Sequence, residues 1–217
     1  EGIGAVLFDE FHERSLDADL GLALTLDVRR GLRQDLRILV MSATLAADRV
    51  AGLLDGAPVI VSEGRSYPVE TRYLGRSVER RIEDQVKDAI MRAVRSGPGS
   101  VLAFLPGQRE ITRVAEALEE TMKGDVILAP LYGAMDPRDQ DQAIAPAPVG
   151  KRKVVLATAI AETSLTIEGI RVVVDSGLAR VPQFEPDVGV TRLVTVRAPL
   201  SSVDQRRGRA GRMEPGV

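Results

Sequence analysis

Two groups of residues near opposite ends of the sequence have types and spacing that suit phosphate chemistry. One is the octapeptide 205–212, which places four arginines and two glycines within eight positions. The planar guanidinium of arginine matches the oxygens of a phosphate two at a time, and glycine lets a backbone approach a bulky anion closely. On its own, this octapeptide is equally compatible with a basic surface tail that binds nucleic acid loosely.

The second group contains two adjacent carboxylates that could hold a metal ion and activate a water molecule. Asp9 and Glu10 follow the apolar run Ala5–Phe8, which is typical of a buried strand. Ligands of open α/β sheets bind at the carboxyl edge of such strands. Mg²⁺ takes one or two carboxylates together with substrate phosphates, so this pair suits phosphoanhydride hydrolysis. A solvated acidic turn explains the same pattern, and a lone histidine such as His12 is more often structural than catalytic.

The elements that must position these groups alternate between strands and helices, as parallel sheets require. Apolar residues recur every four positions from Leu16 to Val28 and predict a helix that ends near Gly31. The rest of this first part is predicted as a strand over 37–41, a short helix around 46–54 and a strand over 58–61. Residues 64–68 interrupt the pattern, so we place a boundary there, between domains 1–64 and 65–217.

The second domain repeats the alternation. Apolar residues at helical spacing predict helices over 82–94 and 111–118. Strands are predicted at 101–105, 126–131, 154–157 and 171–174. Two strand-like runs, 178–184 and 190–197, flank a turn cluster and predict a β-hairpin. We assign the apolar faces of all these elements to the core.

The composition agrees with a globular protein and excludes some classes of site. At 217 residues and 44% hydrophobic, the chain allows one large or two small domains. No apolar run approaches the length of a membrane span, and the lack of cysteine excludes disulfides and thiolate metal sites. We therefore expect a cytoplasmic protein that contacts no membrane. Because the formal net charge is −2, nucleic-acid contacts must come from local patches.

Five segments resemble, in order, the motifs of the DEAH-box helicases of superfamily 2. These are residues 9–16 (motif II), 42–44 (motif III), 104–108 (motif IV), 157–167 (motif V) and 205–212 (motif VI). Phe11 replaces the alanine of the family name, which resembles the bacterial HrpB-type branch. The resemblance covers nearly the whole chain and implies two tandem RecA-like α/β domains with parallel sheets. The first would be truncated, and the second would carry the hairpin at 178–197, where the family has a hairpin implicated in parting the duplex.

The resemblance also implies an activity and its catalytic residues. The family couples ATP hydrolysis, with Mg²⁺, to translocation on and unwinding of RNA, and we leave DNA open as the substrate. Asp9 would hold Mg²⁺ and Glu10 would deprotonate the attacking water, with His12 beside them. Gln205 would position that water, and Arg209 and Arg212 would act as arginine fingers on the γ-phosphate across a cleft between the two domains.

Further roles follow from family position. Three residues are predicted to couple the nucleotide state to the grip on the strand: Ser42, Thr44 and Ser164. Four are predicted to contact the phosphates of a nucleic acid without reading its bases: Gly107, Gln108, Thr158 and Thr166. Ile144 stands where many relatives have a phenylalanine that stacks on adenine, so NTP choice is expected to be broad. Ala159 stands where relatives commonly have asparagine, which removes one side chain able to contact the strand.

The sequence contains no Gly-x-x-x-x-Gly-Lys-Thr loop, which superfamily 2 motors carry upstream of motif II. We therefore expect a fragment of a larger helicase. The alternative is a binding or regulatory module that never hydrolyses ATP. A phosphate-binding loop encoded upstream of Glu1 would decide for the enzyme, and its absence from the intact gene would decide against it.

We predict that the chain of residues 1–217 by itself shows no measurable ATPase activity, because the loop that cradles the phosphates is not among its residues. Phosphate release, measured with and without Mg²⁺ and RNA, checks this expectation. A robust metal-dependent rate would contradict it.

Overall fold

The structure is a computed structural model that describes residues 2–13, 15–42, 47–62, 67–122, 124–162 and 165–217. The chain divides into two compact units, unit 1 (Glu1–Gly64) and unit 2 (Arg65–Val217). Both units contain parallel strands connected through helices, so the predicted α/β class is confirmed. The assignment of unit 1 to part of a RecA-like domain stays a prediction.

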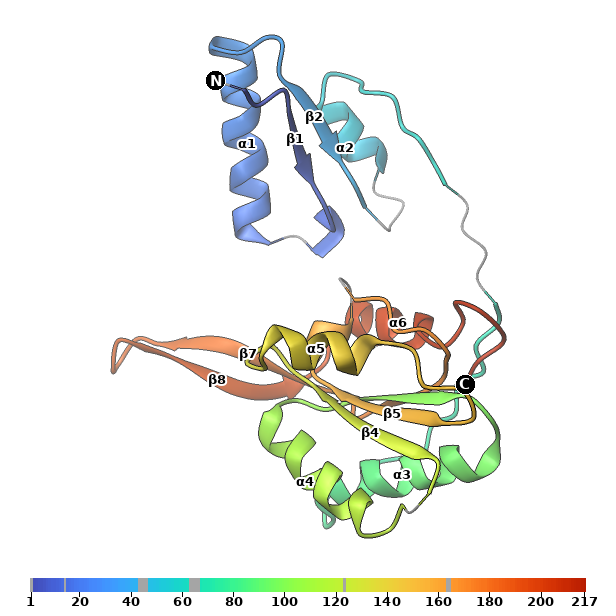
Figure 1. The fold of residues 1–217 in the computed structure, drawn as a ribbon. Coiled ribbons are helices and arrows are strands. Elements are labelled where there is room, and N and C mark those ends of the chain that lie inside the picture. Colours follow the sequence, from blue (N-terminus) through green and yellow to red (C-terminus); the bar gives the residue numbers. More distant parts are fainter. Residues whose placement is uncertain (1, 14, 43–46, 63–66, 123, 163–164) are drawn as a thin grey trace. The chain divides into compact units, whose positions relative to one another are not determined.

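Unit 1 is built on two parallel strands. β1 (Ala5–Phe8) pairs with β2 (Arg37–Val40), and η1 (Phe11–Glu13) and α1 (Leu16–Gly31) connect them, before α2 (Ala47–Leu53) (Figure 1). A small core forms around Phe11, Leu22 and Leu54. The parallel pairing places the ends of β1 and β2 at the same edge of this sheet.

Helix α1 forms where the sequence predicts it, but its leucine face is not core. The helix begins after Ser15, whose hydroxyl accepts a hydrogen bond from the N–H of Ala18 at 3.1 Å. The residues that recur every four positions are exposed: Leu16 (81%), Leu20 (54%), Leu24 (58%) and Val28 (38%). Our assignment of this face to the core is wrong for the described residues, because the two strands cover only the side of α1 that carries Leu22.

The strand predicted over 58–61 is also wrong. These residues form no regular element, and Ile60 is 90% exposed. Among the described residues no strand pairs with them, so their backbone groups have no ladder to join. Apolar side chains alone do not make a strand when its neighbour is missing.

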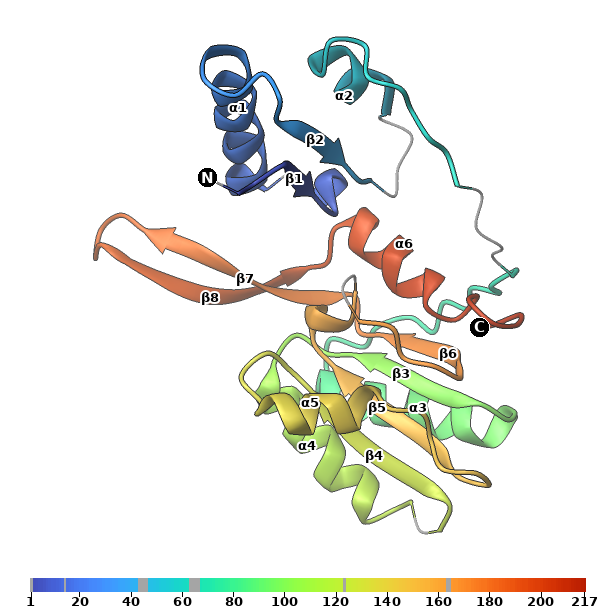
Figure 2. The same cartoon turned by 45° about the horizontal axis from the view of Figure 1, so that its top comes forward.

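Unit 2 contains a four-stranded parallel sheet in the order β4-β5-β3-β6. The strands are β3 (Ser100–Phe104), β4 (Val126–Leu131), β5 (Arg152–Ala157) and β6 (Ile170–Asp175). Helices α3 (Ile82–Ser96) and α4 (Gln108–Glu119) cover one face, and α5 (Pro137–Ile144) and α6 (Leu200–Gly208) lie on the other (Figures 1 and 2). The strands and helices predicted in this part of the chain are present, with ends that differ by a few residues.

The pleat of β3 divides its side chains between two cores. Val101 and Ala103 pack in the cluster under α3 and α4, together with apolar residues of both helices. Leu102 and Phe104 point to the other face and pack in a second cluster that includes Ala143 of α5. All five residues of β3 are buried, which places this strand at the centre of the sheet.

Helices α5 and α6 were not predicted, because their sequences are mostly polar. The side chain of Asp136 caps the start of α5 by accepting the N–H of Arg138 at 2.9 Å. At its other end, Lys153 Nζ donates to the carbonyls of Gln142, Ala143 and Ala145 at 2.9, 3.2 and 2.5 Å. Burial lowers the pKa of the Lys153 ammonium. In the described part of the chain, no helix combines the length and apolar character needed to cross a membrane.

The predicted β-hairpin is confirmed. β7 (Leu178–Glu185) pairs in antiparallel register with β8 (Val190–Arg197) over eight residue pairs. Gly189 in the connecting turn has φ of 66°, a conformation that glycine adopts without strain. The ribbon extends from the sheet, and its Phe184 and Leu193 are 60% and 65% exposed (Figure 2).

The end of the chain packs on the first described segment of unit 2. The N–H of Tyr67 donates to the carbonyl of Gly211 at 2.8 Å, and the N–H of Gly216 donates to the carbonyl of Pro68 at 3.0 Å. A Cβ atom on Gly211 would lie 2.6 Å from the carbonyl oxygen of Tyr67. We therefore correct our expectation that Gly211 lets the backbone approach an anion. This glycine instead lets the end of the chain approach the backbone of Tyr67.

We predict that Gly211→Ala destabilises unit 2 by about 1–3 kcal/mol, because the new methyl group would press on backbone rather than on a flexible side chain. Gly208→Ala, in the same octapeptide, has no heavy atom within 4 Å of the new Cβ. Because alanine favours a helix over glycine, this control should be neutral or stabilising by up to about 1 kcal/mol. Urea unfolding of the two variants compares them, and equal midpoints would contradict the packing argument.

Candidate functional site

The two predicted catalytic carboxylates lie directly after the carboxyl end of β1. The N–H of Glu10 donates to Oδ1 of Asp9 at 2.8 Å. Glu10 has φ of 48°, in the left-handed region that residues other than glycine rarely occupy and that is often found at functional sites. Its Oε2 lies 3.4 Å from Nδ1 of His12, so the structure brings Asp9, Glu10 and His12 together.

Backbone hydrogen bonds join this acidic segment to the end of β2. The N–H of Phe11 donates to the carbonyl of Met41 at 3.0 Å, and the N–H of Met41 donates to the carbonyl of Phe8 at 2.8 Å. Ser42, predicted to couple nucleotide and strand, follows Met41 and is exposed. Thr44 and Ser164, which have the same predicted role, lie outside the described residues.

Phe11 has a structural reason to differ from the alanine of the family name. Its side chain is 4% exposed and belongs to the core of unit 1. Its ring meets that of Phe8 edge to face, with 6.4 Å between the ring centroids. The larger residue therefore anchors the segment that carries Asp9 and Glu10.

Three predicted strand-contact residues lie at one edge of the sheet of unit 2. Gly107 is the N-cap of α4 and Gln108 its first residue, shortly after β3, and Thr158 follows β5. Their segments are joined to their neighbours, because Gln108 Nε2 donates to the hydroxyl of Tyr132 at 3.1 Å and the N–H of Thr158 donates to the carbonyl of Leu131 at 3.1 Å. Gln108 is exposed, Thr158 is half-buried and Gly107 is buried.

The burial of Gly107 comes from the base of the hairpin. A Cβ atom there would lie 2.6 Å from Nη1 of Arg180 and 2.9 Å from Oε2 of Glu110. Arg180 of β7 and Glu110 of α4 form an ion pair at 3.5 Å over this glycine. Seventy positions separate these two charges, so no local sequence pattern could have revealed the pair.

The fourth strand-contact residue is hydrogen-bonded to a predicted catalytic one. Arg212 Nη1 donates to Oγ1 of Thr166 at 3.1 Å, and both residues are exposed. Thr158 and Thr166 belong to the same connection between β5 and β6. Unit 2 therefore places a predicted phosphate finger beside a predicted strand contact.

The other two predicted catalytic residues of unit 2 lie in or next to α6. Gln205 is half-buried within this helix. Arg209 follows α6 and is only 6% exposed. Its Nε donates to the carbonyl of Glu162 at 2.9 Å, and its Nη1 donates to the carbonyl of Leu165 at 2.7 Å. In this structure the guanidinium of Arg209 contacts the backbone of its own domain.

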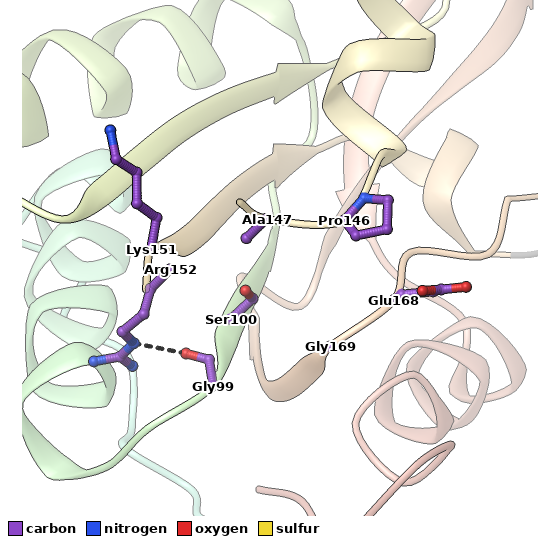
Figure 3. Close-up of a pocket in the computed structure, with 8 residues that line it drawn as sticks. All are labelled: Gly99, Ser100, Pro146, Ala147, Lys151, Arg152, Glu168 and Gly169. Carbon is purple, nitrogen blue, oxygen red and sulfur yellow. Dashed lines mark hydrogen bonds between the residues drawn. The ribbon is translucent and has the colours of Figure 1, made fainter. Parts of the chain in front are cut away.

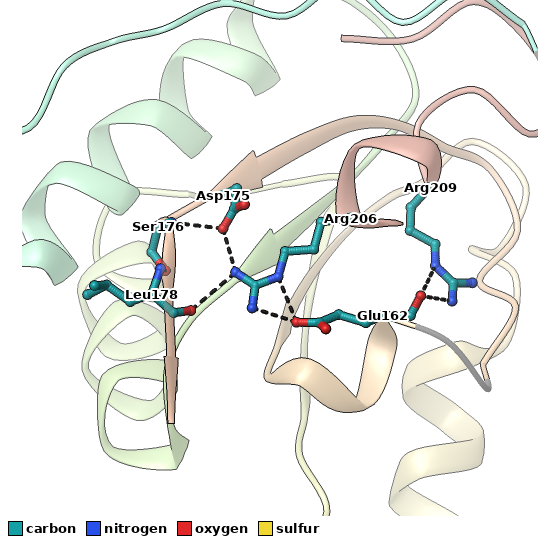
Figure 4. Close-up of polar contacts among 7 residues, drawn as sticks. Glu162, Asp175, Ser176, Leu178, Arg206 and Arg209 are labelled. Atoms are coloured by element: carbon teal, nitrogen blue, oxygen red, sulfur yellow. Dashed lines mark hydrogen bonds and ion pairs between the residues drawn. The ribbon is translucent and has the colours of Figure 1, made fainter. Parts of the chain in front are cut away.

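Arg206, which was not predicted as a site residue, is the most buried arginine of the octapeptide at 1% exposed. Its Nε donates to Glu162 Oε1 at 2.7 Å, and its Nη1 donates to Asp175 Oδ1 at 2.7 Å and to the carbonyl of Leu178 at 3.1 Å (Figure 4). The guanidinium also lies 5.0 Å from the centre of the Phe104 ring. The helical spacing of positions 206 and 209 was the available signal that these two arginines share a face.

A hollow of about 300 Å³ lies at the other edge of the sheet, at the amino ends of β3, β5 and β6 (Figure 3). Its lining includes Ser100, Pro146 and Glu168. Among the described residues, none that the sequence predicts as a site residue lines it. Ile144, the predicted base contact, ends α5 and packs partly against the second core cluster.

The chain matches a known protein family. Residues 84–214 match the family described as the helicase conserved C-terminal domain. This match includes the sheet of unit 2, the hairpin and the whole octapeptide 205–212.

Individual proteins are similar over nearly the whole chain. The ATP-dependent RNA helicase HrpB of Escherichia coli is 58% identical over 100% of the chain, which covers 27% of that protein. The probable ATP-dependent RNA helicase DHR2 of Saccharomyces cerevisiae is 39% identical over 97% of the chain and 30% of its own length. A crystal structure of the E. coli DEAH/RHA helicase HrpB superposes with a TM-score of 0.92, over 100% of this chain and 28% of that one.

We predict that Arg206→Ala destabilises unit 2 by about 3–5 kcal/mol, because it leaves two largely buried carboxylates without their cation. Arg207→Ala is the matched control, since it removes the same charge from the neighbouring position. Arg207 pairs with Asp204 only at the surface, so its loss should change stability by about 0.5 kcal/mol or less. Denaturant unfolding measures both, and similar midpoints for the two variants would contradict the role of Arg206.

Proposed function

The chain belongs to the DEAH-box helicases, within the family of the helicase conserved C-terminal domain, and on this premise we propose that its parent protein is an ATP-dependent RNA helicase. The chain spans 27% and 30% of the lengths of two curated relatives, so the activity belongs to the longer protein. The relatives' names, which specify ATP and RNA, support this choice of nucleotide and strand.

Unit 1 supplies the carboxylates of the hydrolytic step. Glu10 accepts the proton of the attacking water, and His12, 3.4 Å from its carboxylate, orients Glu10. Asp9 would hold Mg²⁺, and the bound ion would supply positive charge to neutralise the charge that develops on the phosphates. The donor set fits this ion: Oδ1 of Asp9 accepts the Glu10 amide, and Mg²⁺ needs few protein oxygens because it keeps several waters. Among the described residues, no group of three or more acids, histidines or cysteines is placed to hold a metal ion by protein ligands alone.

Unit 2 supplies positive charge and the grip on the strand. Arg212 is exposed and meets the γ-phosphate, where a supplied arginine is worth roughly 10³–10⁵ in rate. Gln205 helps to position the water, and Ile144 contacts the base. Gln108, Thr158 and Thr166 contact strand phosphates, so that binding does not depend on base sequence. Ser42, together with Thr44 and Ser164, couples the state of the bound nucleotide to the binding of the nucleic-acid strand.

The observation that carries the proposal is the geometry after β1. A carboxylate held in a strained backbone conformation, at the carboxyl end of a parallel strand and beside a histidine, suits a positioned general base. A cytoplasmic location and a second nucleic-acid class, DNA, stay predictions.

We predict that Glu10→Gln in the full-length parent lowers RNA-stimulated ATP hydrolysis by at least about 100-fold, because the amide cannot accept the proton of water. Binding of a fluorescent ATP analogue should change little, since the substitution keeps the shape of the side chain. Steady-state phosphate release with single-stranded RNA measures the effect, and single-stranded DNA in parallel tests the choice of strand.

Asp17→Asn is the matched control, because Asp17 is an exposed acid at the start of α1. It should hydrolyse ATP at the rate of the unaltered parent. Undiminished turnover in Glu10→Gln would remove Glu10 from its role. An unaltered parent that releases no phosphate with RNA would overturn the enzymatic proposal in favour of a binding module.

A further inference from the structure

The four arginines of the octapeptide 205–212 have two kinds of environment. Arg206 and Arg209 are 1% and 6% exposed, and their guanidinium groups turn into unit 2 (Figure 4). Arg207 and Arg212 are exposed. A buried guanidinium must have its donors satisfied by the protein, whereas the outward pair, which contacts Asp204 and Thr166, is also open to solvent.

The partners of Arg209 are main-chain carbonyls of the loop that joins β5 to β6. Nε donates to the carbonyl of Glu162 at 2.9 Å, Nη2 donates to the same oxygen, and Nη1 donates to the carbonyl of Leu165 at 2.7 Å. Glu162 is the C-cap residue directly after the short turn η2 (Ala159–Ala161), where helical carbonyls have no partner of their own. Arg209 therefore closes the end of this turn and ties it to the residues that follow.

Glu162 is held at two points by one helix. Its carboxylate accepts hydrogen bonds from Arg206 within α6, and its carbonyl accepts them from Arg209 at the helix end. Other described contacts also hold this loop: the N–H of Thr158 donates to the carbonyl of Leu131 at 3.1 Å, and the N–H of Ala161 donates to the carbonyl of Thr158 at 3.2 Å. At its far end, Arg212 Nη1 donates to Oγ1 of Thr166 at 3.1 Å. Of these contacts, those of the Arg209 guanidinium are the ones that join Glu162 to Leu165.

We propose that Arg209 is a positioning residue for strand binding, which sets the conformation of the described loop residues 158–162 and 165–166 before any nucleotide is bound. The inference rests on the proposed function for the roles of Thr158 and Thr166, which lie on this loop. This role differs from the predicted contact of Arg209 with the γ-phosphate. A residue that acts only on a bound nucleotide has no effect on the affinity for the strand when no nucleotide is bound.

The first test needs only the chain of residues 1–217. Amide hydrogen exchange of Ala161 and Glu162 is compared in the unaltered chain, Arg209→Ala and the charge-matched control Arg207→Ala. We expect Arg209→Ala to speed exchange at these two amides by at least about tenfold and Arg207→Ala to leave it unchanged. Exchange within β3 is the reference for global stability, and it should stay slow in both variants. Equal protection of the loop in both variants would overturn the proposal.

Arg209→Lys covers the case in which the alanine variant unfolds. Lysine keeps the charge but has a single donor atom in place of the Nε, Nη1 and Nη2 that Arg209 places on the two carbonyls, so loop exchange should still speed up while β3 stays protected. Loop protection in Arg209→Lys equal to that of the unaltered chain would show that charge alone suffices, and would overturn the assignment to the guanidinium donors.

The second test uses the full-length parent without nucleotide. Fluorescence anisotropy with a labelled single-stranded RNA should show Arg209→Ala binding about tenfold more weakly than Arg207→Ala, although both lose one positive charge. Equal affinities of the two variants would overturn the link to the strand. If the unaltered parent binds no RNA, the proposed function fails, while the exchange result still decides whether Arg209 positions the loop.

Discussion

A buried guanidinium is the constraint on which the rest of unit 2 depends. A charge taken out of water is tolerated only where it is paired and hydrogen-bonded. Arg206, 1% exposed, meets this condition with groups from several segments: the loop after β5, the end of β6, the start of β7 and the ring of Phe104 in β3. Because these partners must be in place together, one side chain of α6 ties the root of the hairpin to the loop that carries the candidate strand contacts.

The helical period of α6 explains why neighbouring arginines of one motif have different environments. Positions 206 and 209 are three apart and face the sheet, whereas Arg207 points to solvent. Arg212 lies beyond the end of α6 and is exposed. Only an exposed guanidinium can meet an incoming anion without first losing its protein partners. The arginines of this basic segment therefore fall into two groups: Arg206 and Arg209 stabilise the domain, and Arg207 and Arg212 are accessible to ligands.

The fold could be predicted from the sequence where apolar spacing is strong. The central strand β3, the amphipathic helices α3 and α4, and the hairpin all carry such a pattern. Helix α5 does not, and it depends on the cap of Asp136 and on the ammonium of Lys153 at its far end. The apolar residues 58–61 show the reverse case, since a suitable pattern forms no strand without a neighbour to pair with.

The candidate site could be predicted where its residues are adjacent in sequence, as Asp9 and Glu10 are, and not where distant residues meet. The burial of Gly107 under Arg180 depends on a contact between distant residues that no local pattern encodes. The same holds for Arg209, whose charge is visible in the sequence but whose partners are not. Lysine would keep that charge but lacks the planar, separated donors with which Nε and Nη1 of Arg209 reach the carbonyls of Glu162 and Leu165. At Arg209 the planar set of donors is therefore what the backbone partners require, whereas at Arg206 two carboxylates require the charge as well.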